Sequence, residues 1–250
     1  MEVCILKLYV VGLGPGEDSQ ITGKALSALE DSHLIVGYKV YTDLIKHLIS
    51  DKEIINTPMK REVDRCKMAV EAAISGKNVA MVSSGDAGVY GMAGLIYEVM
   101  TEYCTNEVEV EVIPGITAAS SAAAILGAPL IMDFAVISLS DLLTPWEEIE
   151  ERIRFAAKTG FVICIYNPSS IKRWNYLKRA CEVVIESIDK DTPCGFVQNI
   201  GRVGQMHKIL KLEELADTQV DMFTTVIIGN KNTKIINGRL VTSRGYSLKA

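Results

Sequence analysis

The chain is poor in histidine, and its cysteines form no paired motif. Three histidines (His33, His47 and His207) stand far apart, and none has metal-ligand spacing with another. The six cysteines are also widely separated and include no C-x-x-C, so the sequence predicts neither a zinc knuckle nor a disulfide scaffold. We therefore expect no metal site built from histidines, and reduced thiols in a cytoplasmic protein.

Positively charged side chains are also fewer than negatively charged ones. Lys and Arg number 26 against 31 Asp and Glu, and the net charge of -5 argues against a nucleic-acid partner. The N-terminus lacks a signal-peptide cleavage pattern. Residues 112–132 carry no charge, but prolines, glycines and alanines make this stretch only weakly apolar, which favours a short buried helix over a membrane span.

Two stretches have the layout strand, glycine-rich loop, helix. Val79 to Val82 is an apolar run that leads into Gly-Asp-Ala-Gly at 85–88, and a helical pattern begins near Val89. Leu8 to Val11 leads in the same way into the glycine-rich segment 12–16. In open α/β sheets such loops follow the carboxyl ends of strands, where ligands bind.

Each of these loops also has a purely structural interpretation. Asp86 is the only charge in its loop, and a turn-forming or N-cap role is as well supported as a ligand contact. Glu17 occupies the third glycine position of the dinucleotide fingerprint, which disfavours a nucleotide-binding dehydrogenase, and no Lys-Ser/Thr follows to make a phosphate loop.

Other elements follow from periodicity. We expect strands at 34–36 and 53–55 and helices at 41–48 and 62–74. Residues 108–113 alternate apolar positions with Glu109 and Glu111, which is typical of a half-exposed antiparallel strand. Pro114-Gly115 ends that strand, and we place a domain boundary there, giving an N-terminal α/β domain (1–114) and a C-terminal α/β domain (115–250).

The second half repeats the alternation of helices and strands. A small-residue helix is expected at 117–126, and Thr144, Pro145 and Glu147 predict the start of a helix over 146–157. A further helix is expected over 171–187. The expected strands are 134–137, 161–165, 195–198, 206–210 and 223–228.

Four small-residue loops at strand ends on a two-part scaffold predict a cleft between the halves. Together they resemble the tetrapyrrole methylase family over nearly the whole chain. The resemblance rests on Val-Gly-Leu-Gly-Pro-Gly (11–16), Gly-Asp-Ala-Gly (85–88), Pro-Gly-Ile-Thr-Ala (114–118), Tyr-Asn-Pro (166–168) and Thr-Thr-Val-Ile-Ile-Gly-Asn (224–230).

The resemblance implies two α/β domains with a cofactor cleft between them, S-adenosylmethionine as cofactor, a tetrapyrrole substrate and a homodimer. The cofactor contacts that it implies are Pro15, Ser84, Gly85, Asp86, Val89, Thr117, Ala118, Tyr166, Asn167, Thr225 and Val226.

Within the family the chain is most similar to members that methylate C-17 of a precorrin-3-type ring in cobalamin synthesis, with contraction of the ring. The markers are segments 36–39, 83–94, 133–146 and 244–246. The Gly-Asp-Ala form at 85–87 is associated with the cobalt-dependent branch, in which cobalt arrives within the substrate. Methylation of another tetrapyrrole carbon and non-catalytic binding of S-adenosylmethionine are the alternatives.

Ring contraction requires proton movement, and the candidates for it are Asp86, Ser138, Asp141 and Thr144. For Asp141, capping of the Thr144 turn is the favoured interpretation. Substrate carboxylates are expected to meet Lys39, Arg61, Lys172 and Arg173. Met132 stands where relatives usually carry a histidine, and serine at 169 or 170 replaces a common arginine.

Overall fold

The computed structural model describes residues 6–103 and 108–247, which leaves Cys4 and Cys104 outside the described residues. Packing divides the chain into two compact units, Met1–Ala118 and Ala119–Ala250, so the division lies slightly beyond the expected one at 114/115. Both units are mixtures of helices and strands, which confirms the α/β class.

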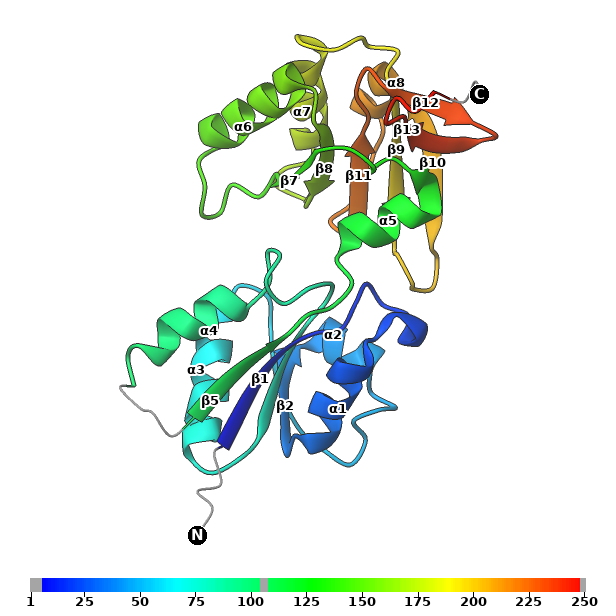
Figure 1. The fold of residues 1–250 in the computed structure, drawn as a ribbon. Helices are drawn as coiled ribbons and strands as arrows, with labels where there is room; N and C mark the ends of the chain where they lie inside the picture. Colours follow the sequence, from blue (N-terminus) through cyan, green and yellow to red (C-terminus); the bar gives the residue numbers. More distant parts are fainter. Residues whose placement is uncertain (1–5, 104–107, 248–250) are drawn as a thin grey trace. The chain divides into compact units, whose positions relative to one another are not determined.

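Unit 1 is built on a five-stranded parallel sheet in the order β3-β2-β4-β1-β5 (Figure 1). All its loops that follow strands therefore emerge at one edge. The strands are β1 (Leu6–Gly12), β2 (Leu34–Tyr38), β3 (Glu53–Thr57), β4 (Val79–Ser83) and β5 (Val108–Ile113).

Helices cover both faces of this sheet. α1 (Gly23–Asp31) packs on one face through Ala25, Ala28 and Leu29, whereas α3 (Glu62–Ile74) and α4 (Ala93–Met100) pack on the other. β1 and β4 are buried on both faces, which explains their unbroken apolar runs. A short helix, α2 (Lys39–Leu44), follows β2.

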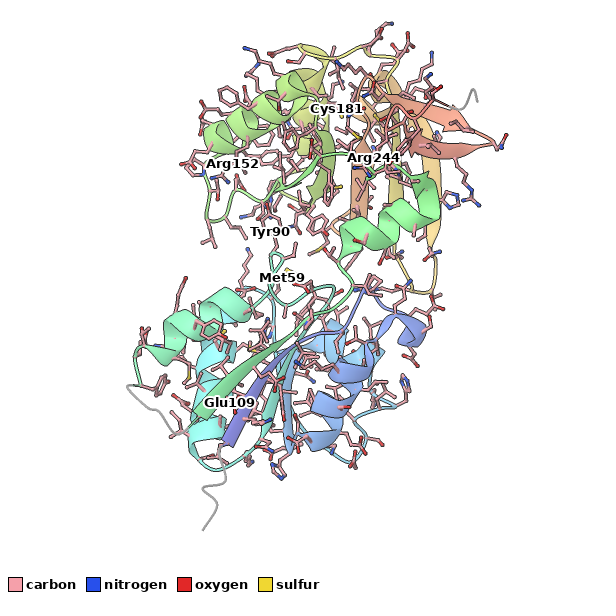
Figure 2. The ribbon with its side chains drawn as sticks, in the orientation of Figure 1. Met59, Tyr90, Glu109, Arg152, Cys181 and Arg244 are labelled. Carbon is pink, nitrogen blue, oxygen red and sulfur yellow. The ribbon has the colours of Figure 1, made fainter. Side chains whose placement is uncertain are left out.

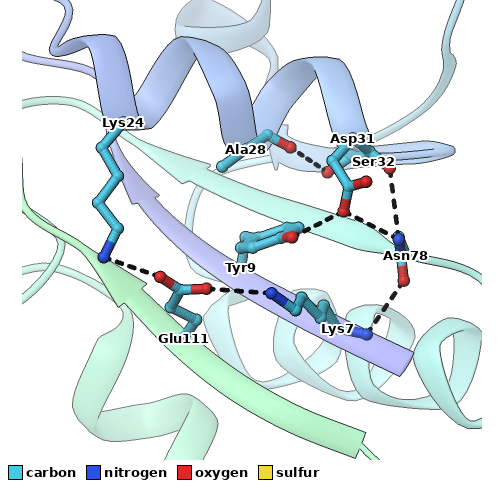
Figure 3. Close-up of polar contacts among 8 residues, drawn as sticks. All are labelled: Lys7, Tyr9, Lys24, Ala28, Asp31, Ser32, Asn78 and Glu111. Atoms are coloured by element: carbon cyan, nitrogen blue, oxygen red, sulfur yellow. Dashed lines mark hydrogen bonds and ion pairs between the residues drawn. The ribbon is translucent and has the colours of Figure 1, made fainter. Parts of the chain in front are cut away.

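The expectation that 108–113 forms an antiparallel strand is wrong. β5 pairs with β1 in parallel, and its alternating exposure arises because it is the edge strand. Glu111 on β5 pairs with Lys24 of α1 at 2.8 Å and with Lys7 of β1 at 3.7 Å (Figure 3). The hydrogen bond from Lys24 lowers the pKa of the Glu111 carboxyl. The acidic residues of β5 are thus explained by its exposed position at the edge of the sheet, and they do not indicate an antiparallel direction.

Unit 2 contains a five-stranded sheet in the order β10-β9-β11-β8-β7. Only β7 and β8 are parallel neighbours, and the other adjacent pairs run antiparallel. The strands are β7 (Phe134–Ser138), β8 (Val162–Tyr166), β9 (Pro193–Gln198), β10 (Met206–Lys211) and β11 (Thr224–Ile228). The amino end of β11 lies at the same edge as the carboxyl end of β8.

One core lies between this sheet and the helices α6 (Trp146–Thr159), α7 (Tyr176–Ile185) and α8 (Leu212–Ala216). A Cβ added to Gly195 of β9 would meet Leu126 of α5 (Ala118–Leu126) at 2.8 Å, so α5 packs closely on the sheet. A small sheet, β12-β13-β6, completes the unit and was not anticipated. Its strands are β6 (Gly127–Ala128), β12 (Thr233–Ile236) and β13 (Arg239–Thr242).

One expectation for the helices of unit 2 is wrong. α7 begins at Tyr176, so 171–175 forms a loop instead of the first turns of a helix. The start of α6 at Trp146 is confirmed, with Pro145 as its N-cap residue. Among the described residues, no helix has the length and hydropathy needed to cross a membrane.

Candidate active site

Three loops of unit 1 contact one another through backbone atoms at the carboxyl ends of the parallel strands. Gly14 and Gly85 exchange backbone hydrogen bonds of 3.0 and 2.7 Å, which joins the loop after β1 to the loop after β4. A Cβ on Gly115 would lie 2.2 Å from the Gly85 carbonyl oxygen and 2.5 Å from that of Gly12. Only glycine permits this approach, because any side chain would force the loops apart.

Asp86 ties the same loops together. Its Oδ1 accepts hydrogen bonds from the backbone N–H of Gly88 (2.8 Å) and Val89 (3.2 Å), and its Oδ2 accepts one from the N–H of Gly115 (3.0 Å). Both carboxylate oxygens are therefore occupied by the backbone. This favours the turn-forming interpretation of Asp86, with the addition that it joins the β4 loop to the segment after β5.

The predicted cofactor contacts of unit 1 all lie in these loops: Pro15 after β1, Ser84, Gly85, Asp86 and Val89 after β4, and Thr117 and Ala118 at the start of α5. Gly85 adopts a left-handed conformation, with φ of 70°. A Cβ placed there would meet only the Ala118 nitrogen, at 3.9 Å. The loop edge thus offers open space beside backbone amides.

Two predicted substrate-binding cations of unit 1 follow neighbouring strands and have local partners. Lys39, at the start of α2, pairs with Asp43 at 2.7 Å. Arg61, which precedes α3, pairs with Asp64. A substrate carboxylate would have to compete with these exposed ion pairs, which are individually weak.

In unit 2, the parallel strands β7 and β8 bring a second set of predicted residues together. Ser138 ends β7, and its Oγ accepts a hydrogen bond of 2.9 Å from Asn167, which follows β8. The hydroxyl of Tyr166 accepts a bond of 2.7 Å from the N–H of Ala119. Thr225 and Val226 of β11 are buried at the same edge of the sheet, with Val226 opposite Ile165.

A clamp, formed by Ser140, Asp141, Arg173 and Tyr176, joins the loops after β7 and β8. Arg173 donates to Ser140 Oγ at 2.6 Å and lies 3.6 Å from Asp141 Oδ1, and the Tyr176 hydroxyl donates to Asp141 Oδ2 at 2.7 Å. Asp141 therefore anchors on Tyr176 and Arg173, and the interpretation that it caps the Thr144 turn is wrong. Arg173 is engaged within the protein, whereas Lys172 beside it is exposed.

Comparison with known proteins identifies the family. The model of the tetrapyrrole (corrin/porphyrin) methylases matches residues 7–216, which includes all three loops of unit 1 and the clamp. The chain belongs to the tetrapyrrole methylase family.

Relatives of this tetrapyrrole methylase carry more specific names. A probable cobalt-factor III C(17)-methyltransferase of Salmonella typhimurium is 47% identical over 96% of the chain and 100% of its own length. A precorrin-3B C(17)-methyltransferase of Sinorhizobium is 38% identical, covering 92% of the chain and 91% of the relative. The crystal structure of the methyltransferase CobJ matches with a TM-score of 0.88 at 34% identity, covering 94% of this chain and 99% of that one.

Some relatives are longer proteins. The chain spans 46% of one relative that is 45% identical to it. The family and fold of this tetrapyrrole methylase are thus shown by full-length matches.

Met132, which the resemblance places at a position usually held by histidine, lies away from the clamp. It precedes β7, whose five residues separate it from the loop that begins at Leu139. Met132 instead lines a hollow of about 480 Å³ together with Gly160 and Asn230. A strand rises about 3.3 Å per residue, so a side chain at position 132 lies more than about 15 Å along the strand from Ser138.

Sequence reasoning missed the contact of Tyr176 and the burial of Arg65 in this tetrapyrrole methylase. Tyr176 was assigned to the interior of a helix, but it begins α7 and anchors Asp141, and the Asp141 hydrogen bond raises its pKa. For Arg65, a cation of the helix expected over 62–74, a solvated face was the default and a contact with substrate carboxylates the alternative, yet it is 4% exposed. Its position four residues before the buried Ala69, on the inner stripe of α3, was the available signal.

Within the described residues, no group of three or more His, Cys, Asp or Glu side chains is arranged to hold a metal ion. The four described cysteines are free and buried. Burial raises the pKa of the Cys66, Cys164 and Cys194 thiols to about 12 in each case.

Proposed function

We propose that the chain methylates C-17 of a cobalt-containing precorrin-3-type tetrapyrrole, with contraction of the ring, in cobalamin biosynthesis. The observation that carries this proposal is the 47% identity to a probable cobalt-factor III C(17)-methyltransferase along that relative's entire length. The relative named for the metal-free substrate, precorrin-3B, is less similar, at 38% identity. The difference favours the cobalt-containing substrate.

The loop chemistry of unit 1 fits S-adenosylmethionine as the methyl donor. This cofactor carries a sulfonium, an amino-acid carboxylate and an adenine, all of which backbone amides and carbonyls can bind. Gly85 leaves open space for such a group, and Asp86 fixes the amides around it. When bound, the cofactor would supply the transferable methyl group.

The chain's own residues would act mainly by alignment. Placing a methyl donor and a nucleophilic carbon in line, with water excluded, accounts for a large share of the rate enhancement of such reactions. Asp86 and Asp141 are held as hydrogen-bond acceptors, which supports positioning roles. Ser138 Oγ is held in the same way, by hydrogen bonds from Asn167 at 2.9 Å and from the N–H of Ser140 at 3.2 Å, so a positioning role is supported for it too.

An anaerobic assay tests the proposal. Purified protein is mixed with labelled S-adenosylmethionine and either cobalt-factor III or metal-free precorrin-3B, and products are followed by mass and absorbance. We expect a gain of one methyl group and a contracted-ring spectrum on the cobalt substrate alone. Turnover of only the metal-free ring would reassign the substrate, and cofactor binding with no transfer to either ring would contradict the C-17 assignment.

We also propose that the protein acts as a homodimer, as the family resemblance implies, and that it is cytoplasmic, as its unpaired cysteines suggest. Sedimentation velocity on the purified chain measures the oligomeric state, and a monomer at micromolar concentration would contradict the first part.

A further inference from the structure

Arg65 is a buried cation of α3. Its side chain projects from α3 toward the loops that follow β3 and β4, and the residue is 4% exposed. Within the described part of the chain, no Asp or Glu oxygen lies close enough to form an ion pair with it. Burying a charge is expensive unless it is paired, so this arrangement needs an explanation.

Among the described residues, the acceptors that hold the guanidinium are all neutral. Nε donates to the hydroxyl of Thr57 at 2.7 Å, and one terminal nitrogen donates to the carbonyl of Pro58 at 3.2 Å. The other terminal nitrogen faces the sulfur of Met92 at 3.8 Å. A thioether is a weak acceptor, and a guanidinium has five N–H groups, so this side of Arg65 retains unused donor capacity.

The loops on either side of Arg65 are strained and display apolar side chains. Lys60 and Tyr90 both adopt left-handed backbone conformations, with φ of 67° and 52°, which non-glycine residues seldom do. Such strain persists where the surroundings enforce it, and it clusters at functional sites. Met59 is 42% exposed and Tyr90 59% exposed, and Figure 2 shows both at the same end of the unit.

We propose that Arg65 is the binding residue for one peripheral carboxylate of the tetrapyrrole. The carboxylate takes the place of the Met92 sulfur on the free side of the guanidinium, while Met59 and Tyr90 contact the apolar ring. Charge-assisted pairing of this kind is strong when both groups are shielded from water. This inference rests on the proposed function, because it requires an acidic macrocycle as substrate.

The competing explanation is that Arg65 is a structural connection between α3 and the two loops. The two roles have different consequences for binding. If Arg65 is only structural, its removal lowers the melting temperature and leaves the affinity for a carboxylated ring unchanged. If Arg65 binds a carboxylate, its removal lowers that affinity, whatever the lost hydrogen bonds to Thr57 and Pro58 cost in stability.

The test uses Arg65→Met and Arg65→Lys in the full-length protein, with Lys67→Met as the matched control. Lys67 lies on the same helix but pairs with Glu102 at 2.7 Å, so its replacement removes the same charge from a site already neutralised. Binding of a stable polycarboxylated porphyrin is measured by fluorescence at several salt concentrations, together with melting temperature and the KM and kcat of methyl transfer.

For Arg65→Met we expect porphyrin affinity to fall by about tenfold or more, with a shallower salt dependence and a raised KM. Arg65→Lys should recover part of the affinity, and Lys67→Met should match the wild type. Loss of thermal stability with unchanged affinity would assign Arg65 a structural role and overturn the inference. A wild-type protein that binds no polycarboxylated ring would contradict the proposed function as well.

Discussion

At the scale of single residues, Gly115 is the most constrained position in the loops of unit 1. An added methyl group would lie 2.2 Å from the Gly85 carbonyl oxygen, against backbone that cannot move independently. We therefore predict that Gly115→Ala separates the β4 loop from the segment after β5 and weakens S-adenosylmethionine binding by about tenfold or more, with a fall in melting temperature. Isothermal titration calorimetry and thermal unfolding measure the two effects.

Gly94 provides the control for this substitution. It lies in α4, and a Cβ added there would meet no atom within 4 Å. Because alanine is a better helix former than glycine, Gly94→Ala should leave cofactor affinity unchanged and raise stability by about 0.5–1 kcal/mol. Equal behaviour of the two variants would show that the close approach at Gly115 has no role in binding.

At the scale of elements, the clamp between the loops after β7 and β8 should behave as one unit. Asp141→Asn and Tyr176→Phe each remove part of the connection through Asp141 Oδ2. We predict that each substitution lowers kcat/KM for methyl transfer. The kcat/KM of the double variant should be no lower than that of the less active single variant, with a coupling energy of about 0.5–2 kcal/mol. Because hydrogen bonding to Asp141 raises the Tyr176 pKa, the phenol stays protonated and the effect should not vary between pH 7 and 9.

An exposed ion pair on α7 supplies the comparison for the clamp. Lys178 pairs with Asp217 at 2.9 Å, and the Lys178 side chain is 51% exposed. Lys178→Met should therefore leave kcat/KM near the wild-type value, as expected for surface pairs. Additive effects of Asp141→Asn and Tyr176→Phe would show that the two residues act separately.

How far the sequence predicted these elements depends on whether the signal was local. α3 was predicted to the residue, and β1, β2, β4 and β7 to within a few, because apolar periodicity and flanking glycines are local features. Strand direction is not local: β5 alternates because it is an edge strand, and its parallel pairing with β1 depends on the other strands.

The candidate site divides in the same way. Glycine-rich loops at strand ends were visible as motifs, and the structure brings those of each unit to one edge of its sheet. Side-chain partners could not be predicted from the sequence. Asp141 contacts Tyr176 because residues 171–175 form a loop and α7 begins at Tyr176. Pairing across 35 residues leaves no pattern in a single sequence.

At the scale of the whole molecule, the buried thiols make the free energy of unfolding fall as the pH rises above 9. Burial raises the pKa of Cys164 and Cys194 to about 12, and that of Cys181 is raised as well. In the unfolded chain the pKa of these thiols is near its ordinary value of 9.0. Their contribution to stability is therefore complete below pH 9 and is lost as the pH rises from 9 toward 12, at up to about 1.4 kcal/mol per pH unit for each thiol.

Tryptophan fluorescence can isolate this effect in unit 2, because both tryptophans of the chain, Trp146 and Trp174, belong to it. We predict that the free energy of unfolding from urea titrations followed by fluorescence falls steeply above pH 9. Cys181→Ala removes one buried thiol, so its curve should fall less steeply by up to about 1.4 kcal/mol per pH unit, while lysine deprotonation affects both proteins alike. Identical slopes would mean that Cys181 does not stay protonated in the folded unit, and its burial would then need another explanation.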